Sequence, residues 1–191
     1  MFIQTESTPN PATLKFLPGQ AVLSEGGADF PNAQSASCSP LAVRLFEITG
    51  VEGVYLGADF VTVTKSDAGQ EWHHLKPMIL GAIMDHFSSG RPVMLEGGVS
   101  ASGHSAGAAG ASGDDEEIIA QIIELLDTKV RPAVAQDGGD IVFRGYENGI
   151  VSVHLQGSCA GCPSSTMTLK NGIENMLKHY IPEVEEVRQV G

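Results

Sequence analysis

A long run of small and polar residues divides this chain into two parts, and it limits the fold more than any other feature of the sequence. The run is GGVSASGHSAGAAGASG at 97–113, in which Val99 is the exception to the small or polar character. Such residues bury too little apolar surface to offset the entropy that they would lose on ordering. We therefore expect a flexible Gly/Ala/Ser linker at 97–113, which joins a domain at 1–96 to a second domain at 114–191.

The composition of the two halves indicates packed, acidic domains. The chain has 191 residues, of which 42% are hydrophobic and 18% charged, as in ordinary globular proteins. Its formal net charge of -12 is shared as -5 (5 basic, 10 acidic) over 1–96 and -7 (6 basic, 13 acidic) over 114–191. A negative field opposes binding to phosphate backbones and to anionic lipid surfaces. We therefore expect no nucleic acid partner and no membrane partner.

The N-terminal residues and the number of cysteines indicate the cellular compartment of the protein. MFIQTESTPNP lacks the basic region and apolar core of a secretory signal. The three cysteines, Cys38, Cys159 and Cys162, are too few for the disulfide framework of a small secreted protein, which favours a reducing compartment. We expect a cytoplasmic bacterial protein, or a protein of the mitochondrial matrix if a transit peptide has been removed.

The first half of the sequence predicts a small α+β layer. Short segments that alternate or run apolar are separated by Pro, Asn and Gly turns, and two further segments place their apolar residues at helical spacing. Two hairpins and two helices follow from these patterns. The expected strands are at 2–6, 13–17, 51–56 and 60–65, and the expected helices are at 40–47 and 77–87.

The second half predicts the order α-β-β-α-β. An apolar stripe from Ile118 to Val130 marks the first helix, and Arg131-Pro132 is expected to weaken or kink its end. A turn at Asp137-Gly138-Gly139-Asp140, which needs positive φ at glycine, leads into the first strand. The expected strands are at 141–146, 150–155 and 184–190, and the expected second helix runs from Pro163 towards Tyr180.

Cys159 and Cys162 form a C-x-x-C pair between a predicted strand and a predicted helix. Pro163 suits the first position of that helix, so the cysteines face a helix N-terminus. Its dipole and free amides favour thiolate, the form that binds metal or attacks disulfides. Gly157 and Gly161 are expected to keep side chains away from the sulfurs.

Two thiolates are too few for a metal centre, because iron–sulfur clusters and structural zinc sites take four ligands. Cys38 is a poor candidate, since it lies alone beyond the linker. A two-fold dimer would bring two C-x-x-C pairs together around one shared, exposed site. The spacing leaves three interpretations open: an iron–sulfur cluster, zinc at a dimer axis, or a thioredoxin-like redox pair. Thioredoxin-like domains place the motif after a βαβ pattern, whereas here a helix and a hairpin precede it.

A longer pattern around the cysteines resembles the NifU-like (Nfu) domain. It comprises DGGD at 137–140, GSCAGCPSS at 157–165 and LKNGIE at 169–174. The first half is similar to the Nfu N-terminal domain, with TPNP at 8–11, LKF at 14–16 and FVTVTK at 60–65. The resemblance implies a carrier, not an enzyme, that binds a [4Fe-4S] cluster between two protomers through Cys159 and Cys162. It also implies delivery of that cluster to apo client proteins, with cluster assembly proteins as further partners.

Three histidines are weaker candidates. His73 and His74 are adjacent, so their side chains are expected to point apart and not to share a metal. His154 lies in the strand that precedes the cysteines and could hydrogen-bond near the site, although a half-buried structural histidine is the simpler interpretation. No P-loop, G-x-G-x-x-G or Ser-His-Asp pattern is present.

Overall fold

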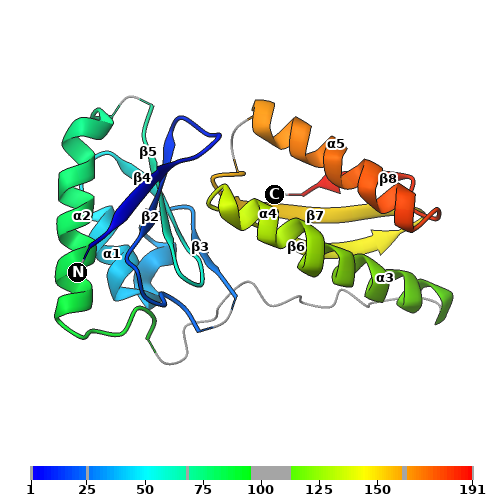
Figure 1. Ribbon diagram of the computed structural model, residues 1–191, viewed down its shortest axis with the longest axis horizontal. Helices are drawn as coiled ribbons and strands as arrows, with labels where there is room; N and C mark the ends of the chain where they lie inside the picture. The colour runs from blue at the N-terminus through cyan, green and yellow to red at the C-terminus, as the bar shows by residue number, and fades with distance from the viewer. Residues whose placement is uncertain (1, 25, 68, 96–112, 161–162, 191) are drawn as a thin grey trace. The chain divides into compact units, whose positions relative to one another are not determined.

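The chain divides into two compact units in a computed structural model that describes residues 2–24, 26–67, 69–95, 113–160 and 163–190 (Figure 1). The units are Met1–Ser102 and Gly103–Gly191. Both combine helices with strands, which confirms an α+β protein of two domains. The predicted linker at 97–113 lies outside the described residues except for Gly113, and the domain limits at 1–96 and 114–191 stay a prediction.

The N-terminal unit is built on a five-stranded antiparallel sheet. Its order is β1-β2-β5-β4-β3, so the two expected hairpins, β1 with β2 and β4 with β5, are confirmed. β3 was not expected, because three residues are too few to show an alternating pattern, and it is held by pairing with β4. The strands are β1 (Gln4–Ser7), β2 (Thr13–Leu17), β3 (Ala28–Phe30), β4 (Val51–Leu56) and β5 (Val61–Lys65).

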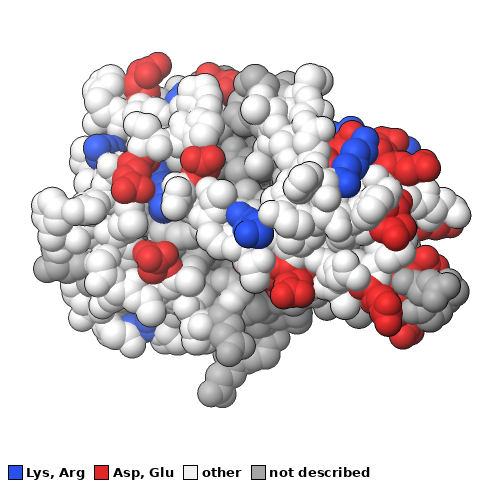
Figure 2. All heavy atoms as spheres, turned by 45° about the vertical axis from the view of Figure 1, so that its right-hand side comes forward, with Lys and Arg blue, Asp and Glu red and all other residues white. Residues whose placement is uncertain are grey.

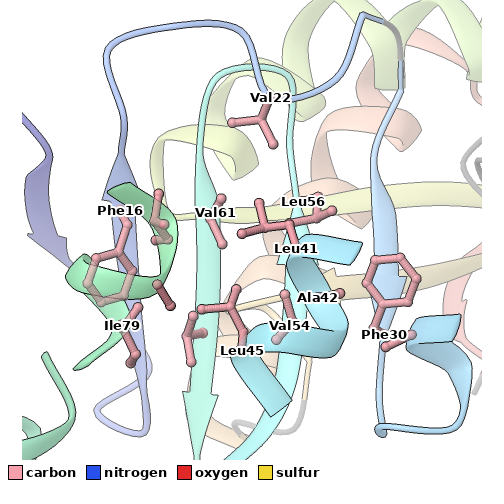
Figure 3. Close-up of a cluster of buried hydrophobic side chains, with 14 of the residues drawn as sticks. Phe16, Val22, Phe30, Leu41, Ala42, Leu45, Val54, Leu56, Val61 and Ile79 are labelled. Carbon is pink, nitrogen blue, oxygen red and sulfur yellow. The ribbon is translucent and has the colours of Figure 1, made fainter. Parts of the chain in front are cut away.

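Two α-helices, α1 (Pro40–Phe46) and α2 (Trp72–Ser88), pack with one face of this sheet, and a 3-10 turn, η1 (Ser35–Cys38), precedes α1. The Ser39 hydroxyl caps α1 by accepting the Ala42 amide at 3.1 Å. Figure 3 shows the resulting core, to which both helices and four of the strands contribute side chains. Its labelled members are Phe16, Val22, Phe30, Leu41, Ala42, Leu45, Val54, Leu56, Val61 and Ile79.

The second helix begins earlier than the sequence predicted. α2 starts at Trp72 and not at Pro77, which lies inside the helix and cannot donate to the carbonyl of His73. Tertiary contacts stabilise the additional turn: Leu75 is fully buried, and the Trp72 indole donates to the carbonyl of Pro11 at 3.0 Å.

His86, near the end of α2, is a buried titratable group. It is 1% exposed, and its Nε2 has no hydrogen-bond partner among the described residues. Burial is the main cause that lowers the pKa of His86, and the positive charges of Arg44 and Arg91 lower it further. The folded N-terminal unit therefore resists protonation of this imidazole more than the unfolded chain does.

We predict that the N-terminal unit loses stability as the pH falls from about 7, because the unfolded chain takes up the His86 proton near pH 6.5 and the folded unit does so at lower pH. His86→Phe should flatten this loss between pH 7 and pH 5. Trp72, the single tryptophan, reports the unfolding of this unit by fluorescence in urea. His74→Gln, at an exposed position of α2, serves as the control, and equal slopes for wild type and His86→Phe would contradict the prediction.

The first helix of the C-terminal unit is a composite. α3 (Gly113–Leu125) passes into a π-helical turn, η2 (Leu126–Val130), and then into α4 (Arg131–Gln136). Pro132 cannot donate to the carbonyl of Thr128, and a wider turn directly before it absorbs this loss. The expected kink is thus a π-turn, after which the helix continues.

A three-stranded sheet and one long helix complete the predicted order α-β-β-α-β. β6 (Gly139–Glu147) and β7 (Ile150–Gly157) pair antiparallel, and β8 (Glu186–Gln189) pairs parallel to β7. Asn148 and Gly149 join β6 to β7 with φ of 50° and 79°, as a tight hairpin turn requires. α5 (Pro163–Tyr180) connects β7 to β8. None of the described helices is long and apolar enough to cross a membrane.

Candidate metal centre

Cys159 lies in the loop between β7 and α5, and hydrogen bonds fix this loop on both sides. The Ser158 amide donates to the carbonyl of Gly138 at 3.2 Å, and the Ser158 hydroxyl donates to the carbonyl of Asp137. From the first turn of α5, the Thr166 hydroxyl donates to the carbonyl of Cys159 at 3.1 Å. The position of the thiol therefore depends on the turn before β6 and on the start of α5.

Gly139 gives the thiol its place against the sheet. A Cβ atom at residue 139 would lie 2.7 Å from the sulfur of Cys159 and 2.7 Å from the carbonyl oxygen of Gln156. Cys159 is 6% exposed and belongs to the hydrophobic core of its unit. Only glycine at position 139 allows the sulfur to pack this close to β6.

A partly buried ion pair supports the strand next to this contact. Arg131 of α4 donates from Nε and Nη2 to the two carboxylate oxygens of Asp140, each at 2.8 Å. Asp140 Oδ1 also accepts the amide of Ile141 at 2.8 Å. The hydrogen bond to Asp140 is the main cause that raises the pKa of Arg131. The pair ties α4 to β6 one residue after Gly139, and loss of Arg131 would remove the charge partner of the buried Asp140 carboxylate.

The protonation state of Cys159 differs from the expectation. Burial raises the pKa of its thiol to about 11. A contact with the Ser158 hydroxyl at 3.9 Å lowers the pKa, whereas the carboxylates of Asp137 and Asp140 raise it. The prediction of a thiolate is therefore wrong for this residue, because desolvation and negative charge outweigh the helix terminus. Metal binding at Cys159 must displace a proton.

The other predicted ligand, Cys162, lies outside the described residues, as does Gly161. Within the part of the chain that the structure describes, no three His, Cys, Asp or Glu side chains gather in a way that could hold a metal ion. The described residues thus do not bring two further ligands to Cys159.

Two family models match the chain, one in each unit. The model described as "Scaffold protein Nfu/NifU N terminal" matches residues 3–90, and the model described as "NifU-like domain" matches residues 122–188. A human relative, 54% identical and covered to 72% of its length, agrees with both matches. The chain belongs to the Nfu family. The resemblance seen in both halves of the sequence is thereby confirmed.

Relatives of this Nfu chain are similar along its whole length. A human protein named "NFU1 iron-sulfur cluster scaffold homolog, mitochondrial" is 54% identical over 190 residues, which cover 100% of this chain and 72% of the human one. The Drosophila virilis protein of the same name is 54% identical over 191 residues, which cover 100% of this chain but only 62% of that protein. A solution structure of a NifU-like protein from Saccharomyces cerevisiae, 28% identical, covers 49% of this chain and 84% of that chain with a TM-score of 0.44.

The remaining sequence candidates lie in structural settings. His154 is half-buried, and its Nδ1 lies 2.9 Å from the carbonyl oxygen of Val190, after β8. His73 and His74 are exposed neighbours in the first turn of α2. The expectation that their side chains point apart is wrong, because their ring centroids lie 3.9 Å apart. Cys38 ends the 3-10 turn of the N-terminal unit, with its sulfur 3.9 Å from the carbonyl oxygen of Ser35.

Sequence reasoning missed the groups that position Cys159. It treated Gly139 as part of a turn, although only Gly138 has the positive φ, at 79°. No sequence pattern indicated that Ser158 or Arg131 helps to position Cys159. The one signal was the DGGD motif, whose second glycine is not needed by the turn and whose last aspartate enters β6 as a buried charge.

We predict that Gly139→Ala destabilises the C-terminal unit by roughly 1–3 kcal/mol, because the added methyl group displaces the thiol or the β7 backbone. Gly145→Ala is the matched control on the same strand, since an added Cβ there has no neighbour within 4 Å. Calorimetry of the full chain measures both, with Trp72 fluorescence identifying the transition of the N-terminal unit. Equal effects of the two substitutions would refute this account of Gly139.

We also predict slow alkylation of Cys159 in the cluster-free protein. With a pKa of about 11, the fraction of thiolate at pH 8 is roughly 100-fold below that of an ordinary cysteine. In a Cys162→Ser variant, iodoacetamide labelling of Cys159 followed by mass spectrometry should be slow in the native protein and fast in guanidinium. Labelling of Cys38 in the same sample shows that the reagent is active. Fast labelling of native Cys159 at pH 8 would contradict the assigned pKa.

Proposed function

We propose that this chain is an iron–sulfur cluster scaffold and carrier. Cys159 and Cys162 bind one side of a [4Fe-4S] cluster, and the same residues of a second copy bind the other side. The observation that carries the proposal is a fixed, buried cysteine at a strand–helix junction, within a C-x-x-C pair of a chain that belongs to the Nfu family. Its relatives are named as iron-sulfur cluster scaffolds, which supports an iron–sulfur cluster as the cargo.

The dimer follows from the count of sulfurs. A [4Fe-4S] cluster takes four cysteinates, and this unit has two cysteines. A two-fold arrangement supplies the other two without a further protein. Ligands shared between two chains can be replaced one side at a time, which suits delivery to apo client proteins. Cluster assembly proteins are the proposed donors.

The pKa of Cys159 favours a carrier over a dithiol oxidoreductase. A redox C-x-x-C pair needs a thiolate of low pKa as its nucleophile, whereas burial raises the pKa of Cys159 to about 11. Zinc would also accept four sulfurs, and the names of the relatives favour iron–sulfur over zinc. We therefore propose a binding protein and not an enzyme.

The mitochondrial matrix is the proposed location. The names of the relatives include the word mitochondrial, which favours this compartment over the bacterial cytoplasm that the sequence also allowed. The net charge of -12 continues to argue against nucleic acid and anionic membranes as partners.

Anaerobic reconstitution with iron and sulfide tests the proposal. The wild-type chain should form a dimer with about four iron and four sulfide per two chains and a thiolate-to-iron absorption band. Cys159→Ser should lose both the cluster and the dimer, because each copy then lacks a ligand. Cys38→Ser, in the N-terminal unit, should keep both. A full cluster on a single chain, or one that survives replacement of Cys159 and Cys162 together, would refute the proposal.

A further inference from the structure

The solvent-facing side of α5 carries no charge along the part of the helix nearest the cysteines. The exposed residues from Thr166 to Asn175 are uncharged, and we call this set the neutral face: Met167, Thr168, Asn171, Gly172 and Asn175. The unit around it is strongly charged, with 13 acidic and 6 basic residues at 114–191. Figure 2 shows acidic side chains gathered instead towards the end of the unit where α3 begins and α5 ends.

The charged residues of α5 are engaged beside the neutral face. Glu174 accepts the amide of Val187 at 3.1 Å and the ammonium of Lys178 at 2.8 Å. Lys170 lies 3.9 Å from Glu186, the first residue of β8. The contacts of Glu174 and Lys170 direct these two charges towards β8, beside the neutral face.

Two members of the neutral face, Met167 and Gly172, are open to solvent. The side chain of Met167 is 66% exposed. An added Cβ at Gly172 would meet nothing within 4 Å, so no neighbour requires glycine there, although glycine weakens a helix interior relative to alanine. Depletion of charge, an exposed methionine and a small residue that allows close approach are features of protein–protein interfaces.

The cluster site indicates which partner covers this face. α5 begins directly after Cys162, and a helix rises about 1.5 Å per residue, so the neutral face lies roughly 6–18 Å along the axis from Pro163. A cluster shared on a two-fold axis brings the starts of both α5 helices together. Residues near such an axis face their own copies, and like charges there would repel. In a unit with a net charge of -7, an uncharged surface lets a second copy approach with little repulsion.

We infer that the neutral face of α5 forms the protein contact between the two chains that share the cluster. The inference rests on the proposed function, and it adds the surface by which a second copy is recognised. The sulfurs alone then do not hold the dimer: Met167, Asn171 and Gly172 contribute to its stability and to the retention of the cluster.

Two substitutions on the neutral face test this inference. Asn171→Glu places a carboxylate on the face and should raise the dissociation constant of the cluster-loaded dimer at least about tenfold, with partial recovery at high salt. Gly172→Ala should raise the thermal midpoint of the cluster-free protein, yet weaken the loaded dimer. Gln121→Glu adds the same charge at an exposed position of α3 and is the matched control, which should behave as wild type.

Analytical ultracentrifugation under anaerobic conditions, with iron and sulfide analysis, separates the outcomes. If Asn171→Glu and Gly172→Ala dimerise as wild type does, the inference is overturned while the proposed function stands. If both keep the loaded dimer but transfer the cluster slowly to an apo client, the face binds clients, and the inference is again overturned. A wild-type chain that takes up no cluster, or holds it alone, overturns both. Should Asn171→Glu fail to fold, Gly172→Ala decides.

Discussion

The packing of the Cys159 thiol against the backbone of Gly139 is the contact on which the organisation of the C-terminal unit depends. It joins the loop after β7 to the first residue of β6, and there is no room for a Cβ atom between them. The hydrogen bonds from Ser158 and the ion pair between Arg131 and Asp140 hold the two sides of this contact in place. Cys159, although it lies in a loop, is thus part of the core of its unit.

Burial of the thiol has a chemical consequence for a carrier. A thiol whose pKa is raised to about 11 stays protonated at neutral pH, and protonated thiols react slowly with oxidants and disulfides. In the proposed carrier, this would slow oxidation of Cys159 in the cluster-free chain. Binding of iron there would replace the proton and neutralise the charge that burial disfavours.

Periodic segments of the sequence predicted most of the secondary structure, and the exceptions share one physical cause. The hairpin of β4 and β5, the apolar stripe of α3 and the helix after Cys162 all follow from local spacing. β3 and the first turn of α2 do not, because each is stabilised by partners distant in the chain. Leu75, for example, starts α2 five residues early by filling the core of the N-terminal unit.

The sequence alone determined the division into two acidic units, the membership of the Nfu family and the supply of only two cysteines to the C-terminal unit. These properties depend on composition and spacing, which need no coordinates. Tertiary structure decided that Cys159 is buried with a raised pKa, that Gly139 makes room for its sulfur, and that α5 presents uncharged exposed residues. Each of these depends on which atoms are brought together by the pairing of β6 with β7 and by the packing of α5. The order of residues along the chain does not by itself give the distances between those atoms.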